Sequence, residues 1–198
     1  MGRRWKLLII IGLSVALIDQ WTKFLAVKHL TPSMETLQSV GAQVSSFYND
    51  IKGPCTNVPS TRCPTVQVID GFWSWRYAEN KGAAWSLFAR AGDAFRVPFL
   101  VGVSILAVFF IVSFVRKLEE HQKMLLYALC LICGGAIGNL IDRIYLGYVI
   151  DFIDWYVGNS HWPTFNIADS AISVGVGLIG LNMVLDHFKG KKPAEATA

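Results

Sequence analysis

The stretch WKLLIIIGLSVALIDQWTKFLAV, residues 5–27, is long and apolar enough to cross a lipid bilayer. A membrane-spanning helix needs roughly 20 mostly apolar residues, each adding about 1.5 Å of rise. Three later stretches meet the same requirement, at about residues 95–115, 124–145 and 167–188. The sequence therefore predicts an α-helical integral membrane protein with four transmembrane helices.

The composition of the whole chain agrees with this class. Of the 198 residues, 53% are hydrophobic and 16% are charged, whereas ordinary soluble domains carry about 25% charged residues. A disordered chain, a coiled coil and a soluble globular domain are thereby excluded. The net charge of +4 is small and its basic residues are scattered, so nucleic acid is not an expected partner.

The direction of the spans follows from the placement of basic residues. Arg3 and Arg4 would also suit a cleaved signal peptide, but no small-residue cleavage site follows the first apolar run, so we expect a retained span. Basic residues flank the spans in three regions that must share one side: Arg3, Arg4 and Lys6, then Arg116, Lys117 and Lys123, then Lys189, Lys191 and Lys192. By the positive-inside rule both termini are cytoplasmic, and residues 28–94 and 146–166 lie outside.

The first outer segment, about residues 29–94, divides into two parts. Residues 31–65 contain four prolines with much Ser, Thr and Asn, which predicts loop with little regular structure. Residues 66–88 alternate between apolar and polar around an Asp70-Gly71 turn signal, which predicts a hairpin leading into a further strand near residues 84–88. We expect a small β-sheet attached to one membrane-embedded domain that comprises residues 1–198.

The four cysteines separate by compartment. Cys55 and Cys63 lie in the outer segment, where an oxidising environment favours a disulfide between them. Cys130 and Cys133 form a CxxC within the third span. That spacing also occurs in metal and redox sites, but an apolar helix offers no further ligands, so we expect both thiols to be packing residues.

Ionisable and amide side chains concentrate at one depth of the predicted bundle, near the outer membrane surface. Ionisable residues inside membrane spans are costly, so each is a functional candidate. Singly, an acid at a helix start or in a loop has an ordinary structural explanation. Asp154 lies at this depth too, and the residues that together indicate a site are Asp19, Lys23, Asn139, Asp142, Arg143, Asp151, Asn166 and Asp169.

Two neighbouring carboxylates at such a site suit metal-free hydrolysis. Close carboxylates cannot both ionise easily, so they share a proton. One can then take a proton from water while the other binds the carbonyl under attack. The four histidines are widely separated and there is no nucleophile elbow or HExxH zinc motif. The residues therefore favour an aspartic hydrolase without a cofactor.

Five motifs strengthen this interpretation: DQWTK (19–23), YAENKGAAWSLF (77–88), GGAIGNLIDRI (134–144), GYVIDF (147–152) and FNIADSAI (165–172). Their order and spacing resemble the lipoprotein signal peptidases, the type II signal peptidases of bacteria. The resemblance implies an aspartic endopeptidase of the bacterial inner membrane. Such enzymes cut prolipoproteins on the N-terminal side of the diacylglyceryl-modified cysteine, at the outer face of the membrane. Expected partners are these substrates and membrane lipids, with the protein acting as a monomer.

The resemblance also implies roles for individual residues. The catalytic pair falls on Asp151 of GYVIDF and Asp169 of FNIADS. Asp142 is a tempting third candidate, but beside Arg143 it better suits a supporting ion pair. Residues expected to bind substrate or order the site are Asp19, Lys23, Asn80, Gly82, Asn139, Asp142, Arg143, Asn166 and Ala168.

Residues 31–65 depart from the resemblance, because the family usually has a shorter segment there. The extra residues could form a lid, contact a partner or be a tolerated surface loop. Two other functions stay open at this point: a proton-coupled transporter that uses intramembrane Asp and Lys, and a non-enzymatic assembly factor. A transporter needs charges along a path through the bilayer, whereas these acids gather at one edge.

Overall fold

The computed structural model describes residues 2–49, 51, 63–82 and 92–189. Four long helices dominate it: α1 (Arg3–Leu30), α3 (Asp93–Lys117), α4 (Lys123–Tyr145) and α5 (Ile167–Lys189). All four are long and apolar enough to cross a membrane, which confirms the predicted spans. Apolar side chains on their outward faces, such as Leu17, Phe110 and Met183, are 65 to 68% exposed. Lipid, not water, is the solvent that suits such faces.

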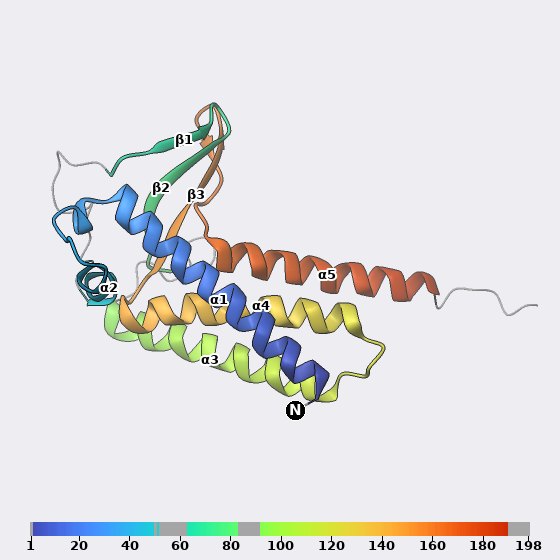
Figure 1. The fold of residues 1–198 in the computed structure, drawn as a ribbon. Coiled ribbons are helices and arrows are strands. Elements are labelled where there is room, and N and C mark those ends of the chain that lie inside the picture. The colour runs from blue at the N-terminus through green and yellow to red at the C-terminus, as the bar shows by residue number, and fades with distance from the viewer. Residues whose placement is uncertain (1, 50, 52–62, 83–91, 190–198) are drawn as a thin grey trace, which may run out of the picture.

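An antiparallel sheet stands at one end of this bundle, here called the sheet end (Figure 1). Its strands run in the order β1 (Val66–Ile69), β2 (Trp73–Asn80), β3 (Val149–Val157) and β4 (Ser160–His161). The predicted hairpin is confirmed, with Gly71 in its turn at a φ of 77°. β3 and β4 were not predicted, because they come from the connection between α4 and α5. The strand expected near residues 84–88 lies outside the described residues.

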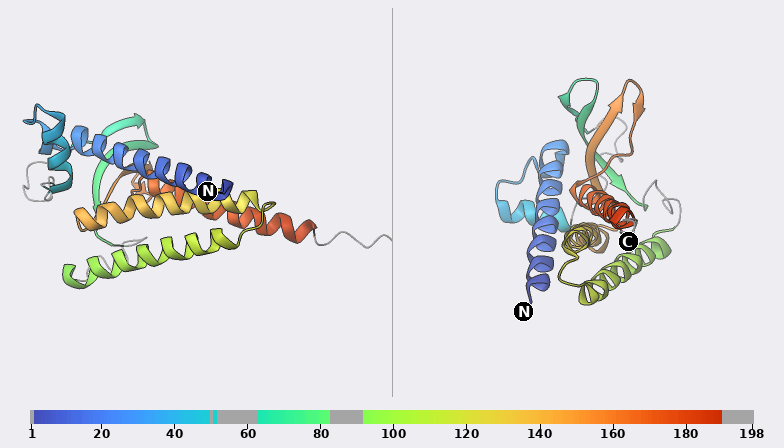
Figure 2. Two further views of the ribbon diagram at one scale, coloured as in Figure 1. Left: turned by 60° about the horizontal axis from the view of Figure 1, so that its bottom comes forward. Right: turned by 90° about the vertical axis from the view of Figure 1, so that its right-hand side faces the viewer.

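The N-terminus, the α3–α4 connection and the end of α5 lie at the opposite end of the bundle from the sheet (Figures 1 and 2). The basic residues that flank the spans at positions 3–6 and 116–123 therefore share one end, as the predicted topology requires. α4 occupies a central position and packs against α1, α3 and α5.

Residues 31–65 contain more regular structure than predicted. A short 3₁₀ helix, η1 (Pro32–Met34), is followed by the helix α2 (Val40–Asn49). The Ser39 hydroxyl accepts a hydrogen bond from the Ala42 N–H at 3.2 Å, as helix-capping serines do. The prediction of loop was wrong there because a ten-residue helix has little stability of its own and depends on tertiary packing that its sequence pattern does not show.

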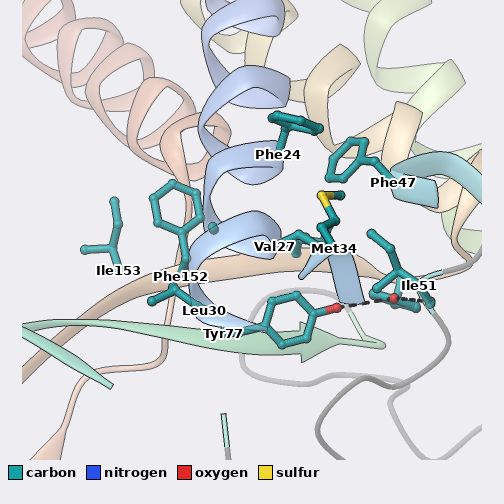
Figure 3. Close-up of a cluster of buried hydrophobic side chains, with 12 residues drawn as sticks. Phe24, Val27, Leu30, Met34, Phe47, Ile51, Tyr77, Phe152 and Ile153 are labelled. Carbon is teal, nitrogen blue, oxygen red and sulfur yellow. Dashed lines mark hydrogen bonds between the residues drawn. The ribbon is translucent and has the colours of Figure 1, made fainter. Parts of the chain in front are cut away.

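Two apolar clusters hold the elements together. The cluster at the sheet end joins α1, η1, α2, β2 and β3, with Phe24 and Phe47 next to each other at one side of it (Figure 3). The second cluster joins α1, α3 and α4 toward the other end. Cys130 and Cys133 are buried free thiols within it, which confirms them as packing residues. Cys63 is disulfide-bonded, and its expected partner Cys55 lies outside the described residues.

Glycines on α4 let its neighbours approach closely. A Cβ at Gly138 would lie 2.6 Å from an Asp19 carboxylate oxygen on α1, and a Cβ at Gly135 would collide with the Ala168 carbonyl on α5. Small residues at helix contacts are the usual means of close packing in membranes. These contacts bring the start of α5 against α4, which places the polar ends of both helices side by side.

We expect Gly135→Val to destabilise the protein by about 1–3 kcal/mol, the usual cost of forcing extra volume into a packed interior. The matched control is Gly102→Val on α3, where an added Cβ meets nothing within 4 Å. Thermal unfolding in detergent can be followed with a thiol-reactive dye, because Cys130 and Cys133 are buried and free. Equal unfolding temperatures for the two variants would contradict the packing argument.

Candidate active site

Two carboxylates lie on either side of one asparagine at the sheet end. Asp151 belongs to β3 and Asp169 to the first turn of α5. The Asn166 side-chain NH₂ donates to Asp151 Oδ1 at 2.7 Å, and the Asn166 amide oxygen accepts from the Asp169 backbone N–H at 2.9 Å. In return, Asp169 Oδ2 accepts from the Asn166 backbone N–H at 3.3 Å. One fully buried side chain thus fixes both acids relative to each other.

Asp151 is 2% exposed, and its environment favours the protonated form. Burial raises the pKa of Asp151 to about 8, and the negative charge of Asp169 acts in the same direction. Hydrogen bonds from Asn80 and Asn166 and the charge of Lys23 oppose this shift without cancelling it. Burial therefore favours the protonated form of Asp151 at neutral pH.

A cluster of buried charged side chains supports the two acids. Lys23 Nζ lies 2.8 Å from Asp19 Oδ2 and 2.8 Å from Asp142 Oδ2, and all three side chains are at most 1% exposed. The same ammonium donates to Asn139 Oδ1 at 3.0 Å. Asn139 Nδ2 in turn donates to Asp169 Oδ1 at 2.8 Å. The cluster therefore connects α1 and α4 directly to one of the two acids.

The cluster also fixes the backbone next to each acid. Asp19 Oδ1 accepts from the Ala168 backbone N–H at 2.9 Å, immediately before Asp169. Asp142 Oδ2 accepts from the Ile150 backbone N–H at 3.0 Å, immediately before Asp151. Asp142 forms its ion pair with Lys23, whereas the neighbouring Arg143, the partner that the sequence suggested, donates to backbone carbonyl oxygens.

Arg143 projects from α4 toward β2. Its guanidinium donates to the carbonyl oxygens of Asn139 and Gly82, each at 3.4 Å. Its Nε is buried and has no hydrogen-bond acceptor among the described residues. An N–H group in this state is ready to bind a further oxygen.

The structure brings together the residues that the sequence placed at one depth, with one exception. Asp154 is buried in a separate cluster in the sheet, where it contacts His161 at 2.9 Å and Ser74 at 3.1 Å. Sequence reasoning missed Gln20, whose NH₂ donates to Asp142 Oδ1 at 2.7 Å. The sequence feature that could have identified Gln20 is its position as a polar residue inside an apolar span, one turn before Lys23.

An apolar pocket of about 290 Å³ lies between α1 and the sheet. Its lining includes Leu25, Leu30, Trp75 and Phe152. Among the described residues, no group of three or more His, Cys, Asp or Glu side chains is arranged to hold a metal ion.

Comparisons with known proteins identify the family of this chain. The family model described as Signal peptidase (SPase) II matches residues 11–185. A lipoprotein signal peptidase of Anaeromyxobacter sp. (strain Fw109-5) is 42% identical over 98% of this chain and 90% of its own length. One from Geobacter sulfurreducens is 48% identical over 62% of this chain and 76% of its own length. A solved bacterial membrane enzyme, 28% identical, superposes with a TM-score of 0.66 over 96% of this chain and 94% of that chain. This membrane protein therefore belongs to the signal peptidase II family of peptidases.

Proposed function

We propose that this protein is an aspartic endopeptidase that removes signal peptides from lipid-modified prolipoproteins. It cuts the peptide bond on the N-terminal side of the diacylglyceryl-cysteine. The observation that carries the proposal is the pair Asp151 and Asp169, fixed by Asn166, with Asp151 in an environment that raises its pKa to about 8. When one acid is ionised and the other is protonated, a metal-free site can activate a water molecule with the first and a carbonyl group with the second.

The reaction follows from those two states. The ionised carboxylate of Asp169 takes a proton from a water molecule as the water oxygen attacks the scissile carbonyl carbon. Asp151 gives its proton to the carbonyl oxygen, and a tetrahedral diol results. In the second half Asp169 donates its proton to the leaving nitrogen while Asp151 takes one back from a diol hydroxyl. The C–N bond breaks and the pair returns to its starting state.

Neighbouring groups position the substrate and the acids. Arg143, with its unpaired Nε among the described residues, is placed to bind a backbone carbonyl of the substrate. Asn80 hydrogen-bonds Asp151 and orients it. Gly82, whose carbonyl accepts from Arg143, lets the substrate backbone pass close to the site. Asn139 holds Asp169 in place through a hydrogen bond, and Lys23 in turn holds Asn139.

The site acts at the outer face of the bacterial inner membrane, with both termini in the cytoplasm. The basic residues at positions 3–6 and 116–123 share the end opposite the sheet, as the positive-inside rule requires. Exposed aromatic residues on the sheet, such as Trp155 (44%) and Trp162 (57%), suit the membrane–water interface. The pocket between α1 and the sheet offers an apolar surface to the lipid-modified substrate. Both acids and the groups that position them come from one chain, which suits a monomeric enzyme.

A proton-coupled transporter fits the site less well. The buried ionisable residues of the described spans are Asp19, Lys23, Arg96 and Asp142, and all lie toward the sheet end. A transport path needs such groups across the depth of the bilayer. Cleavage is therefore the activity to test.

The test uses the purified protein in detergent and two forms of one prolipoprotein, with and without the diacylglyceryl group on its cysteine. We expect cleavage of the lipidated form only, with the new N-terminus at the modified cysteine. Equal cleavage of both forms would remove the lipid requirement from the proposal. No cleavage of either form would overturn the proposed function.

The rate should also depend on pH in a defined direction. Because catalysis needs the proton on Asp151, kcat/KM should fall about tenfold per pH unit above pH 8, where that proton is lost. Initial rates with the lipidated substrate, measured in neutral detergent on both sides of pH 8, provide the check. A rate that continues to rise with pH above this value would contradict a protonated Asp151 in the reaction.

A further inference from the structure

α2 lies outside the motifs that carry the family resemblance, yet it contacts the scaffold of the candidate active site. The helix lies beside the sheet-end portions of α1 and α4 (Figure 1). Phe47 of α2 is 2% exposed, and its ring meets Phe24 of α1 edge to face, with centroids 5.7 Å apart (Figure 3). Tyr48 packs against Tyr145 of α4, with ring centroids 5.1 Å apart. α2 is therefore docked on the enzyme core.

A chain of hydrogen bonds leads from α2 toward the two acids. The Tyr48 hydroxyl donates to Gln20 Oε1 at 3.2 Å, and Gln20 Nε2 donates to Asp142 Oδ1 at 2.7 Å. The other oxygen of Asp142 accepts from the backbone N–H of Ile150, the residue before Asp151. Three hydrogen bonds and two side chains, those of Gln20 and Asp142, thus connect Tyr48 to the strand that carries Asp151.

Tyr48 reinforces the orientation of the Gln20 amide, whose Nε2 donates both to Asp142 Oδ1 at 2.7 Å and to the Gly138 carbonyl oxygen at 3.2 Å. A glutamine side chain can rotate so that its oxygen and its nitrogen exchange places. In the reversed orientation the Gln20 oxygen would face the Asp142 carboxylate, and Asp142 would lose a buried donor. A hydroxyl that donates to Oε1 favours the orientation in which Nε2 faces Asp142.

A second contact from the same segment holds the entry to β3. The Tyr148 hydroxyl donates to the carbonyl oxygen of Ile51 at 2.8 Å. Tyr145 and Tyr148 flank the turn between α4 and β3, so the segment that contains α2 touches both sides of that turn. The position of β3, and with it Asp151, therefore depends on residues outside the family motifs.

We propose that Tyr48 is a positioning residue of this peptidase, which acts through Gln20 and Asp142 to set the position of Asp151. The proposal rests on the proposed function. It assigns α2 a role in the rate of the chemical step and not in covering the site or binding a partner. Tyr48 touches neither substrate nor the reacting atoms.

Tyr48→Phe removes the hydroxyl and keeps the ring. We expect kcat to fall about three- to tenfold with KM unchanged, since one net hydrogen bond is worth that factor. The unfolding temperature should stay close to that of the native protein. The matched control is Tyr156→Phe, which removes another tyrosine hydroxyl that donates to a glutamine oxygen, that of Gln67, in an exposed part of the sheet. Its kcat should equal that of the native protein.

The double variant Tyr48→Phe with Gln20→Met separates positioning from simple packing. If Tyr48 acts through Gln20, the double variant is no slower than Gln20→Met alone. The proposal is overturned by additive effects, by a kcat for Tyr48→Phe within twofold of native, or by a change in KM alone. Native protein that leaves the lipidated substrate intact would overturn the proposed function and the Tyr48 proposal together. An active native enzyme with an unaffected Tyr48→Phe variant would overturn only the latter.

Discussion

Asp151→Asn and Asp169→Asn should each lower kcat on the lipidated prolipoprotein by about 10³-fold or more, since loss of a general acid or base costs 10² to 10⁴. The two acids act as a unit, so the loss of either removes the function of both. An asparagine at position 151 can still accept the hydrogen bond from Asn166, so the fold should persist. Single-turnover cleavage of purified variants is the measurement.

Two controls make this result decisive. Asp154→Asn changes another buried carboxylate of β3, three residues further along, which contacts His161 and Ser74 and not the pair. It should keep near-native cleavage.

The stability of Asp151→Asn gives the second control. The folded-state pKa of the Asp151 carboxyl is raised to about 8, so this group lowers the stability of the native protein as pH rises from about 4 to 8. Asp151→Asn should therefore unfold at or above the native temperature at pH 8. A variant that kept cleavage within tenfold of native would make Asp142 the next candidate.

Lys23→Met should lower the free energy of unfolding by about 3–5 kcal/mol, the usual cost of removing one partner from a buried ion pair. The substitution leaves Asp19 and Asp142 without their common counterion, since both carboxylates lie 2.8 Å from Lys23 Nζ. It also removes a donor from Asn139, which holds Asp169. Thermal unfolding followed through the buried thiols gives the stability, and cleavage should fall with it.

Lys28→Met on the same helix is the matched control, because Lys28 is exposed. Its unfolding temperature should be that of the native protein. Combining Lys23→Met with Asp142→Asn should recover part of the lost stability, since one unpaired charge is then removed. Identical unfolding temperatures for Lys23→Met and Lys28→Met would show that the buried ions are not coupled as the geometry indicates.

The sequence predicted the spans and the gathering of polar residues because both depend on position along a helix. Counting residues from the ends of apolar runs placed Asp19, Asn139 and Asp169 at one depth, and the structure joins them through Lys23 and Asn139. Motif resemblance singled out Asp151 and Asp169. The bridging geometry of Asn166 could not be predicted, because it depends on how the turn before α5 folds against β3.

The missed elements depend on contacts between distant residues. β3 pairs with β2, for example Asp151 with Ala78, and no local signal links a strand to a partner so far along the chain. α2 could not be predicted for the same reason. The contacts of Phe47 and Tyr48 are with Phe24, Gln20 and Tyr145, which lie elsewhere in the sequence. The proline and serine content of residues 31–65 predicted loop, but it carried no information about how these residues pack.

The spacing of Asp19 and Lys23, one turn apart on α1, also matters before the protein has folded. Asn139, which later joins them from α4, follows Lys23 by 116 residues, so α1 is synthesised and inserted into the bilayer well before that helix exists. An isolated charge is expensive in hydrocarbon, whereas opposite charges at this spacing face each other on the same helix. During biogenesis the first span therefore carries its own counterion, which lowers the cost of its insertion until Asp142 and Asn139 arrive.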